Sequence, residues 1–190
     1  MKPSHLIRGL SAVALAGLLL PAWSQQQLVP AQSSVNFVSK QMGVPVEGHF
    51  SKFSAQLAFD PAKPANSKIA FSVDVGSATL GVREADAELP KPVWFNSAKF
   101  PQATFQSSTV KGLGNGRYEV AGRLTIKGAS SDVVVPVALT QSGATTWATG
   151  AFPIKRLTFK IGENEWADTS MVADEVQVKF KLALTGVGKL

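Results

Sequence analysis

Hydrophobic and polar side chains alternate along the chain between residues 117 and 139. From Arg117 to Lys127 one face of an extended chain carries Tyr118, Val120, Gly122, Leu124 and Ile126, and the other face is mostly charged or polar. Residues 127–131 are turn formers, and the alternation resumes in a valine-rich run over residues 133–139. A period of two is typical of a half-buried strand. The pattern therefore predicts an antiparallel hairpin with one apolar and one polar face.

Most of the remaining chain repeats this pattern of short alternating runs separated by turn residues. Further strands are predicted from residue 35 up to a break at 42–45, and over residues 46–50, 53–59, 69–75, 103–111, 147–154 and 176–184. The turn at 60–66 contains two prolines, and Gly114-Asn115-Gly116 is a strong hairpin signal because these residues tolerate positive φ. About eight or nine strands with short connections and no βαβ alternation predict an all-β antiparallel sandwich or barrel.

Residues 77–101 interrupt the alternation. The spacing predicts a short helix within Thr79–Leu89, and two prolines follow it. The segment after them carries large aromatic side chains at Trp94, Phe95 and Phe100. Adjacent bulky side chains cannot all be buried beneath one two-faced strand. We expect a helix and loop folded over one mouth of the barrel, either as a lid over a ligand or as a plug of the core.

A period of two does not tell the inside of a barrel from its outside. An outer-membrane barrel would turn its apolar face to lipid and its polar face inward. Aromatic residues are not paired at the strand ends, and Lys179 and Lys181 give strand 176–184 an ordinary water-facing side. We therefore favour a water-soluble barrel with an apolar interior.

The first residues resemble an export signal. Lys2 and Arg8 precede the apolar run Leu10–Leu20, and Ala22-Trp23-Ser24 offers small residues for a signal peptidase. The run is about half of the ~20 residues that span a bilayer. We expect a signal peptide at residues 1–24, cleavage after about Ser24, a periplasmic protein, and one domain over residues 25–190.

Composition and charge narrow the possible functions. The chain has no cysteine, which excludes disulfides and thiolate chemistry. Its formal net charge is +6, but the basic residues are scattered and form no run. This surplus favours a solubilising surface over a dedicated anion site, and no motif supports nucleic-acid binding.

Candidate catalytic groups are few. Once the leader is removed His49 is the only histidine, and no Gly-x-Ser-x-Gly motif is present. A lone histidine beside Gly48 in a strand is typical of a barrel surface or rim. The acidic residues Glu163, Glu165 and Asp168 fall in a predicted loop, where solvated charge or a modest calcium affinity is the ordinary expectation. We expect no enzymatic activity, no cofactor and no dedicated metal site.

Several motifs resemble those of the YceI-like, polyisoprenoid-binding proteins. They are Ser33-Ser34-Val35-Asn36-Phe37, the stretch from Gly48 to Phe53, the stretch from Lys99 to Phe105, and Leu124-Thr125-Ile126-Lys127-Gly128 with its following valines. The resemblance covers Ala31 to Leu184. It implies a lipocalin-like eight-stranded antiparallel β-barrel whose elongated cavity holds a long isoprenoid chain, such as an isoprenoid quinone or a polyprenyl phosphate, without catalysis.

One segment departs from the family pattern. Many members carry an Arg-Asp pair, a His-Leu pair, and two phenylalanines followed by aspartate after the third strand. The matching positions here are Ala85-Asp86, Glu88-Leu89 and Trp94-Phe95-Asn96. Because the arginine and the histidine are missing, headgroup contacts at those positions are not carried over to this chain.

The apolar alternation gives a list of candidate ligand-binding side chains. We expect the interior to be lined by Phe37, Phe71, Val73, Phe105, Leu124, Ile126, Trp147, Val178 and Phe180, and the mouth by Trp94, Phe95 and Phe100. The same residues would fill a packed barrel, so a stress-related interaction module without a lipid stays open as the alternative. For the carrier we expect an isoprenoid lipid or quinone as partner, with transient contact to a membrane surface or a membrane redox protein.

Overall fold

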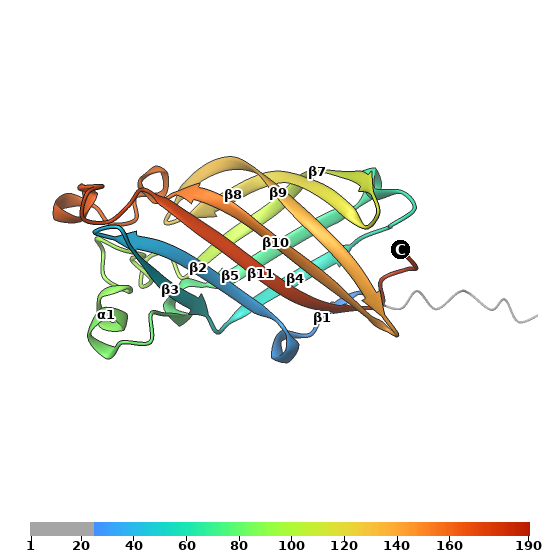
Figure 1. Ribbon diagram of the computed structural model, residues 1–190, viewed down its shortest axis with the longest axis horizontal. Coiled ribbons are helices and arrows are strands. Elements are labelled where there is room, and N and C mark those ends of the chain that lie inside the picture. Colours follow the sequence, from blue (N-terminus) through green and yellow to red (C-terminus); the bar gives the residue numbers. More distant parts are fainter. Residues whose placement is uncertain (1–24) are drawn as a thin grey trace, which may run out of the picture.

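The computed structural model describes residues 25–190, and in it one antiparallel sheet curls around an apolar interior (Figure 1). The predicted signal peptide lies outside the described residues. The elements in chain order are β1 (Gln27–Leu28), β2 (Ser34–Gln41), β3 (Val44–Phe50), β4 (Phe53–Ala58), β5 (Lys68–Asp74), β6 (Ala78–Thr79), α1 (Arg83–Glu88), β7 (Gln102–Gly114), β8 (Arg117–Ile126), β9 (Ala129–Ser142), β10 (Thr145–Lys155) and β11 (Glu175–Thr185).

Two bent strands close the sheet into a ring. β3 continues into β4 past Ser51 and Lys52, and β5 continues into β6 through a short 3₁₀ turn. β4 pairs with β5, and β3 pairs with β6. The other edge of β3 pairs with β2, and β2 in turn pairs with β11. With β3–β4 and β5–β6 each taken as one bent strand, the barrel has eight strands. The predicted eight-stranded antiparallel β-barrel is confirmed.

A two-residue strand that the sequence pattern did not reveal, β1, extends the sheet at the end of β11. Leu28 of β1 pairs with Leu184 of β11. The side chain of Gln26 donates to the Phe59 carbonyl at 2.6 Å and accepts from the Phe59 amide at 2.7 Å. The polar segment before β2 therefore joins β11 to the end of β4.

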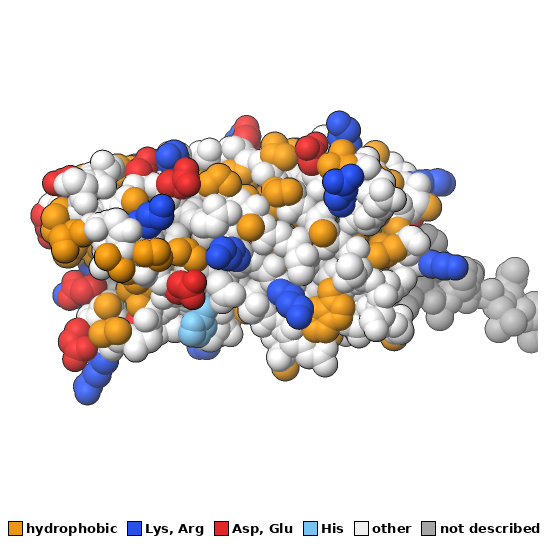
Figure 2. Space-filling view, in the orientation of Figure 1, with side chains coloured by type: hydrophobic (Ala, Val, Ile, Leu, Met, Phe, Trp, Pro, Cys, Tyr) orange, Lys and Arg blue, Asp and Glu red, His pale blue; other side chains and the backbone are white. Residues whose placement is uncertain are grey.

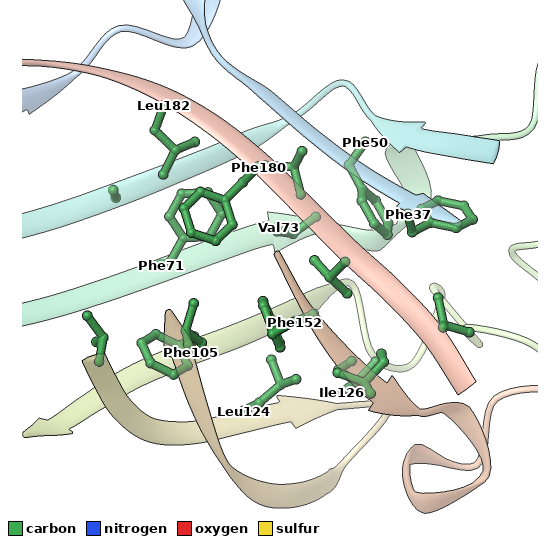
Figure 3. Close-up of a pocket in the computed structure, with 18 of the residues that line it drawn as sticks. Phe37, Phe50, Phe71, Val73, Phe105, Leu124, Ile126, Phe152, Phe180 and Leu182 are labelled. Atoms are coloured by element: carbon green, nitrogen blue, oxygen red, sulfur yellow. The ribbon is translucent and has the colours of Figure 1, made fainter. Parts of the chain in front are cut away.

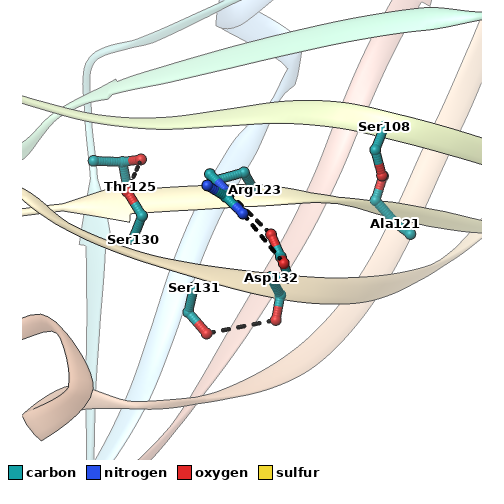
Figure 4. A network of polar contacts seen from close by, with 7 residues as sticks. All are labelled: Ser108, Ala121, Arg123, Thr125, Ser130, Ser131 and Asp132. Carbon is teal, nitrogen blue, oxygen red and sulfur yellow. Dashed lines mark hydrogen bonds and ion pairs between the residues drawn. The ribbon is translucent and has the colours of Figure 1, made fainter.

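The faces of the predicted hairpin over residues 117–139 are as expected. Along β8, Val120, Leu124 and Ile126 are buried. The outer face of the same strand carries polar contacts to β9 (Figure 4): Arg123 donates to both carboxylate oxygens of Asp132 at 3.1 and 3.3 Å, and the Thr125 and Ser130 hydroxyls lie 2.8 Å apart. The apolar faces of the strands thus point inward, as predicted for a water-soluble barrel.

Proline in β9 sits where the sheet does not need its missing amide proton. Pro136 has no backbone N–H, so it fits only a position where the sheet requires no hydrogen bond from it. β10 pairs with β9 only as far as Gly150 opposite Val137, so Pro136 has a strand neighbour on the β8 side alone.

The predicted helix is present as α1, at the end of the barrel where β2 meets β3 (Figure 1). The Asp86 carboxylate accepts hydrogen bonds of 2.5 Å from the Thr79 hydroxyl and from the Leu80 amide. These bonds hold the pKa of Asp86 below its ordinary value. Asp86, the one polar residue kept from the family pattern, thus fixes the loop between β6 and α1. Within residues 25–190, no helix has the length and apolarity to cross a membrane.

Candidate functional site

The barrel encloses a cavity of about 270 Å³ (Figure 3). Every long strand contributes to its wall, and so does the segment after α1. Apart from Ser39, Tyr118 and Arg156, the side chains along this wall are apolar. The cavity runs between two packed apolar clusters, one around Val120 and Leu139 and one around Leu124 and Phe159 at the α1 end. The interior is therefore a hollow with hydrocarbon walls.

Most of the candidate residues meet in this wall. The predicted interior residues that line the cavity are Phe37, Phe71, Val73, Phe105, Leu124, Ile126, Val178 and Phe180. Trp94 and Phe95 line it from the segment after α1, as expected for the mouth. These residues come from five strands and one loop, and the barrel brings them together.

Trp147 does not line the cavity, and its placement in the interior was wrong. Gly150 of β10 lies opposite Phe180 of β11, whose side chain points inward. Because side chains alternate along a strand, Ala148 shares the inward face and Trp147 takes the outward one. The Lys181 ammonium lies 4.5 Å from the centre of the Trp147 ring on the outer wall.

Phe100, predicted to bind the ligand at the mouth, does not contact the cavity. It is absent from the cavity wall and lies against the turn between β8 and β9. A Cβ built on Gly128 would lie 2.9 Å from Cε1 of Phe100, and the Lys99 ammonium lies 5.4 Å from the ring centre. The aromatic ring therefore covers the tight turn, where Gly128 has a φ of 77°.

Glycines in neighbouring strands make room for three of the inward phenylalanines. Phe37 lies opposite Gly48, and Phe180 lies opposite Gly150. A Cβ at either glycine would overlap the facing ring, and one at Gly122 would lie 2.6 Å from Cζ of Phe105. These rings lie against the wall over glycines instead of projecting into the centre, which keeps the barrel hollow.

Sequence analysis missed other aromatic residues of the wall. Phe50 and Phe152 line the cavity, and Phe50 links Phe37 to Phe95 through ring-centre distances of 5.3 and 5.9 Å. Phe152 lies two residues after Gly150, so the strand alternation that excludes Trp147 also predicts Phe152. Phe50 lies next to the irregular spot at Ser51, where the alternation is interrupted and gives no clear face.

A buried arginine organises the long segment between β10 and β11. Arg156 is 2% exposed, and its guanidinium donates to the carbonyls of Ile161, Gly162, Trp166, Val172 and Ala173 at 2.6–3.1 Å. All of its donor nitrogens are thus used by backbone oxygens. Burial lowers the pKa of Arg156. The arginine shapes this side of the mouth and has no free N–H group to offer a ligand.

A buried lysine and a tryptophan pair complete the mouth. Lys127, 7% exposed, donates to the Lys160 carbonyl at 2.6 Å and to the Glu163 carboxylate at 2.8 Å. The hydrogen bond from Lys127 lowers the pKa of Glu163. Trp94 packs against Trp166 with ring centres 5.4 Å apart. The mouth is therefore built from contacts between loops.

Groups for catalysis or metal binding do not converge on this cavity. His49 is exposed on the outer face of β3. Among residues 25–190, no three side chains of the metal-binding types His, Cys, Asp and Glu gather closely enough to hold an ion. A ligand in this cavity would be bound mainly by burial of its apolar surface against the wall.

Comparison with known proteins places this geometry among related barrels. A YceI-like domain matches residues 26–184. A UPF0312 protein of Shewanella baltica is 33% identical over 144 residues, 73% of this chain and 75% of its own. The crystal structure of BcnA from Burkholderia cenocepacia is 49% identical with a TM-score of 0.80, over 82% of this chain and 98% of that one. A polyisoprenoid-binding domain from Saccharophagus degradans, 17% identical with a TM-score of 0.67, shares the fold over 85% of this chain and 98% of its own.

Proposed function

Since the chain belongs to the YceI-like family, we propose that it binds a long isoprenoid lipid, an isoprenoid quinone or a polyprenyl phosphate, in the barrel interior. The observation that carries this proposal is the cavity itself. Its lining residues reach from Leu184, which pairs with β1, to Trp94, which follows α1, and its wall is almost wholly hydrocarbon. The solved polyisoprenoid-binding domain, which has the same fold, supports the same class of ligand.

The physical chemistry of the wall fits a flexible hydrocarbon chain. Burial of each CH₂ group contributes roughly 0.8 kcal/mol. A few prenyl units therefore exceed the ~8 kcal/mol of micromolar binding before ordering costs are subtracted. The volume of about 270 Å³ lies just below the range of about 300–1,000 Å³ that is usual for ligand sites. Selection of the ligand then rests on length and girth more than on hydrogen bonds.

The carrier role follows from the chemistry of such a ligand. A polyprenyl chain is almost insoluble in water and needs a shield to leave a membrane. The leader-like residues 1–24 support export, and we propose that the protein carries its lipid through the periplasm without catalysis. The alternative, an interaction module with a fully packed interior, does not account for the cavity.

Equilibrium binding of purified protein tests the proposal. An isoprenoid quinone and a polyprenyl phosphate of matched chain length, each in mild detergent, should bind saturably and raise the melting temperature. Ala148→Leu adds bulk to the cavity wall and should weaken binding about tenfold or more. Ala151→Leu, on the exposed face of the same strand, is the matched control and should bind like the wild type. Absence of saturable binding by the wild type to either lipid would refute the proposal.

A further inference from the structure

Exposed apolar side chains gather at the end of the barrel where the cavity has its mouth. Met42 and Val44, at the turn between β2 and β3, are 70% and 63% exposed. Val82, just before α1, is 53% exposed, and Met171, just before β11, is 46% exposed. We call these four residues the mouth rim. In the space-filling view apolar side chains appear at this end among charged ones (Figure 2).

The rim is joined to the cavity wall through neighbouring residues. The Met42 amide donates to the Met171 carbonyl at 2.9 Å, which ties the β2–β3 turn to the segment before β11. Val172, adjacent to Met171, is 3% exposed and lines the cavity, as does Ser39 three residues before Met42. Met42 and Met171 are therefore close neighbours, along the chain, of residues of the cavity wall.

The backbone of the β2–β3 turn holds the Met42 side chain at the exposed tip of the hairpin. Met42 has a φ of 47° and Gly43 a φ of 81°, so the turn holds two successive left-handed residues. Asparagine or glycine is the usual residue at the first of these positions. A methionine there places a flexible apolar side chain in water at a position where a polar residue would fit the backbone better.

The net charge of the mouth end bears on which kind of membrane surface the rim can bind. The segments 40–45, 79–101, 127–128 and 155–175, which form the mouth end, carry as many acidic as basic side chains. The basic surplus of the barrel lies elsewhere. Attraction to an anionic surface is therefore not built into the mouth, whereas insertion of apolar tips into a bilayer interface needs no net charge.

From this arrangement we infer that the mouth rim docks on the surface of a zwitterionic lipid bilayer, inserting Met42, Val44, Val82 and Met171 among the lipid headgroups. This inference rests on the proposed function, because a lipid that fills the cavity comes from a bilayer. Docking brings the mouth against the membrane, so an isoprenoid chain passes from the bilayer into the cavity with less exposure to water.

Flotation with vesicles of phosphatidylcholine tests docking without any ligand. The rim variant combines Met42→Asn, Val44→Thr, Val82→Thr and Met171→Gln, which match the backbone preference or the shape of each residue. The wild type should float with the vesicles, and the rim variant should partition at least tenfold less. The control variant combines Leu113→Gln, 43% exposed at the opposite end, with Val134→Thr, 58% exposed on the outer wall, and should float like the wild type.

A second measurement separates docking from lipid binding. The rim variant should bind an isoprenoid quinone in detergent with wild-type affinity but extract it from vesicles at least tenfold more slowly. A wild type that does not float, or a rim variant that floats and extracts like the wild type, overturns the docking inference. A wild type that floats but binds no quinone or polyprenyl phosphate in detergent supports docking and refutes the proposed function.

Discussion

The ring of Phe37 on β2 occupies the space in which Gly48 on β3 would carry a side chain. The two residues face each other across the strand pair, and a Cβ at position 48 would overlap the ring. Phe37 lines the cavity and packs 5.3 Å from Phe50, measured between ring centres. A hydrogen atom at one position thus allows an aromatic ring at the other to lie against the wall.

Gly48→Ala should therefore narrow the cavity. The nearest atoms to the new methyl group belong to the Phe37 ring, so this side chain has to turn toward the centre. We expect a loss of stability of about 1–3 kcal/mol and a loss of isoprenoid affinity of about tenfold. Urea unfolding and equilibrium binding measure both. Gly112→Ala, whose Cβ would have its nearest contact at 3.4 Å, should change neither.

Neighbouring positions of β11 should respond oppositely to the same charge. Phe180→Asp places a carboxylate in the hydrocarbon interior and should abolish soluble folding, because an unpaired buried charge costs several kcal/mol. Lys179→Asp, on the exposed face, should alter stability by only about 0.5 kcal/mol. Soluble yield and thermal unfolding measure the difference. If both variants behave alike, the assignment of the two strand faces is wrong.

Arg156→Met should destabilise the mouth more than its distance from the barrel centre suggests. The substitution leaves five backbone carbonyls without the donor that joins them, so a loss of about 3 kcal/mol or more is expected. Hydrogen exchange should rise across residues 156–174, as seen by mass spectrometry of peptides. Lys155→Gln, which removes an exposed 3.7 Å ion pair with Glu175, is the control and should leave exchange unchanged.

The contribution of Asp86 should depend on pH. Hydrogen bonds from Thr79 and Leu80 lower the pKa of Asp86 in the folded protein, so its carboxylate favours folding above its ordinary pKa of 3.8. That contribution is lost as the pH falls through the lowered pKa. Asp86→Asn should therefore melt below the wild type at neutral pH, and the gap should shrink in acid. A gap independent of pH would contradict the assignment. Glu84→Gln, in the same helix, is the control.

Alternation along the chain predicted an all-β antiparallel sandwich or barrel and much of the apolar wall, and the resemblance to the YceI-like family selected the eight-stranded barrel. The run from Arg117 to Ile126 shows which side chains face inward and which face outward, because one face of β8 lies against the apolar interior and the other faces water. The same rule, applied strictly to β10, would have placed Phe152 inside and Trp147 outside. A bulky aromatic residue on an outer wall is stabilised by neighbours such as Lys181, which a list of apolar residues does not show.

Features that depend on contacts between distant segments had no signature in the sequence. The acceptors of Arg156 are backbone carbonyls, which every residue has, so no motif marks them. Whether the barrel is hollow depends on the register that sets Gly48 opposite Phe37 and Gly150 opposite Phe180. Alternation fixes which face a residue takes but not its partner across the sheet.

The most direct test of the isoprenoid proposal is organic extraction of the protein purified from its native host, followed by mass spectrometry of the extract. We expect a prenyl lipid or isoprenoid quinone at close to one molecule per protein. The Ala148→Leu variant should retain less of it, and the Ala151→Leu variant should retain as much as the wild type. Repeated extracts without a stoichiometric isoprenoid, together with no thermal shift on adding one, would contradict the account.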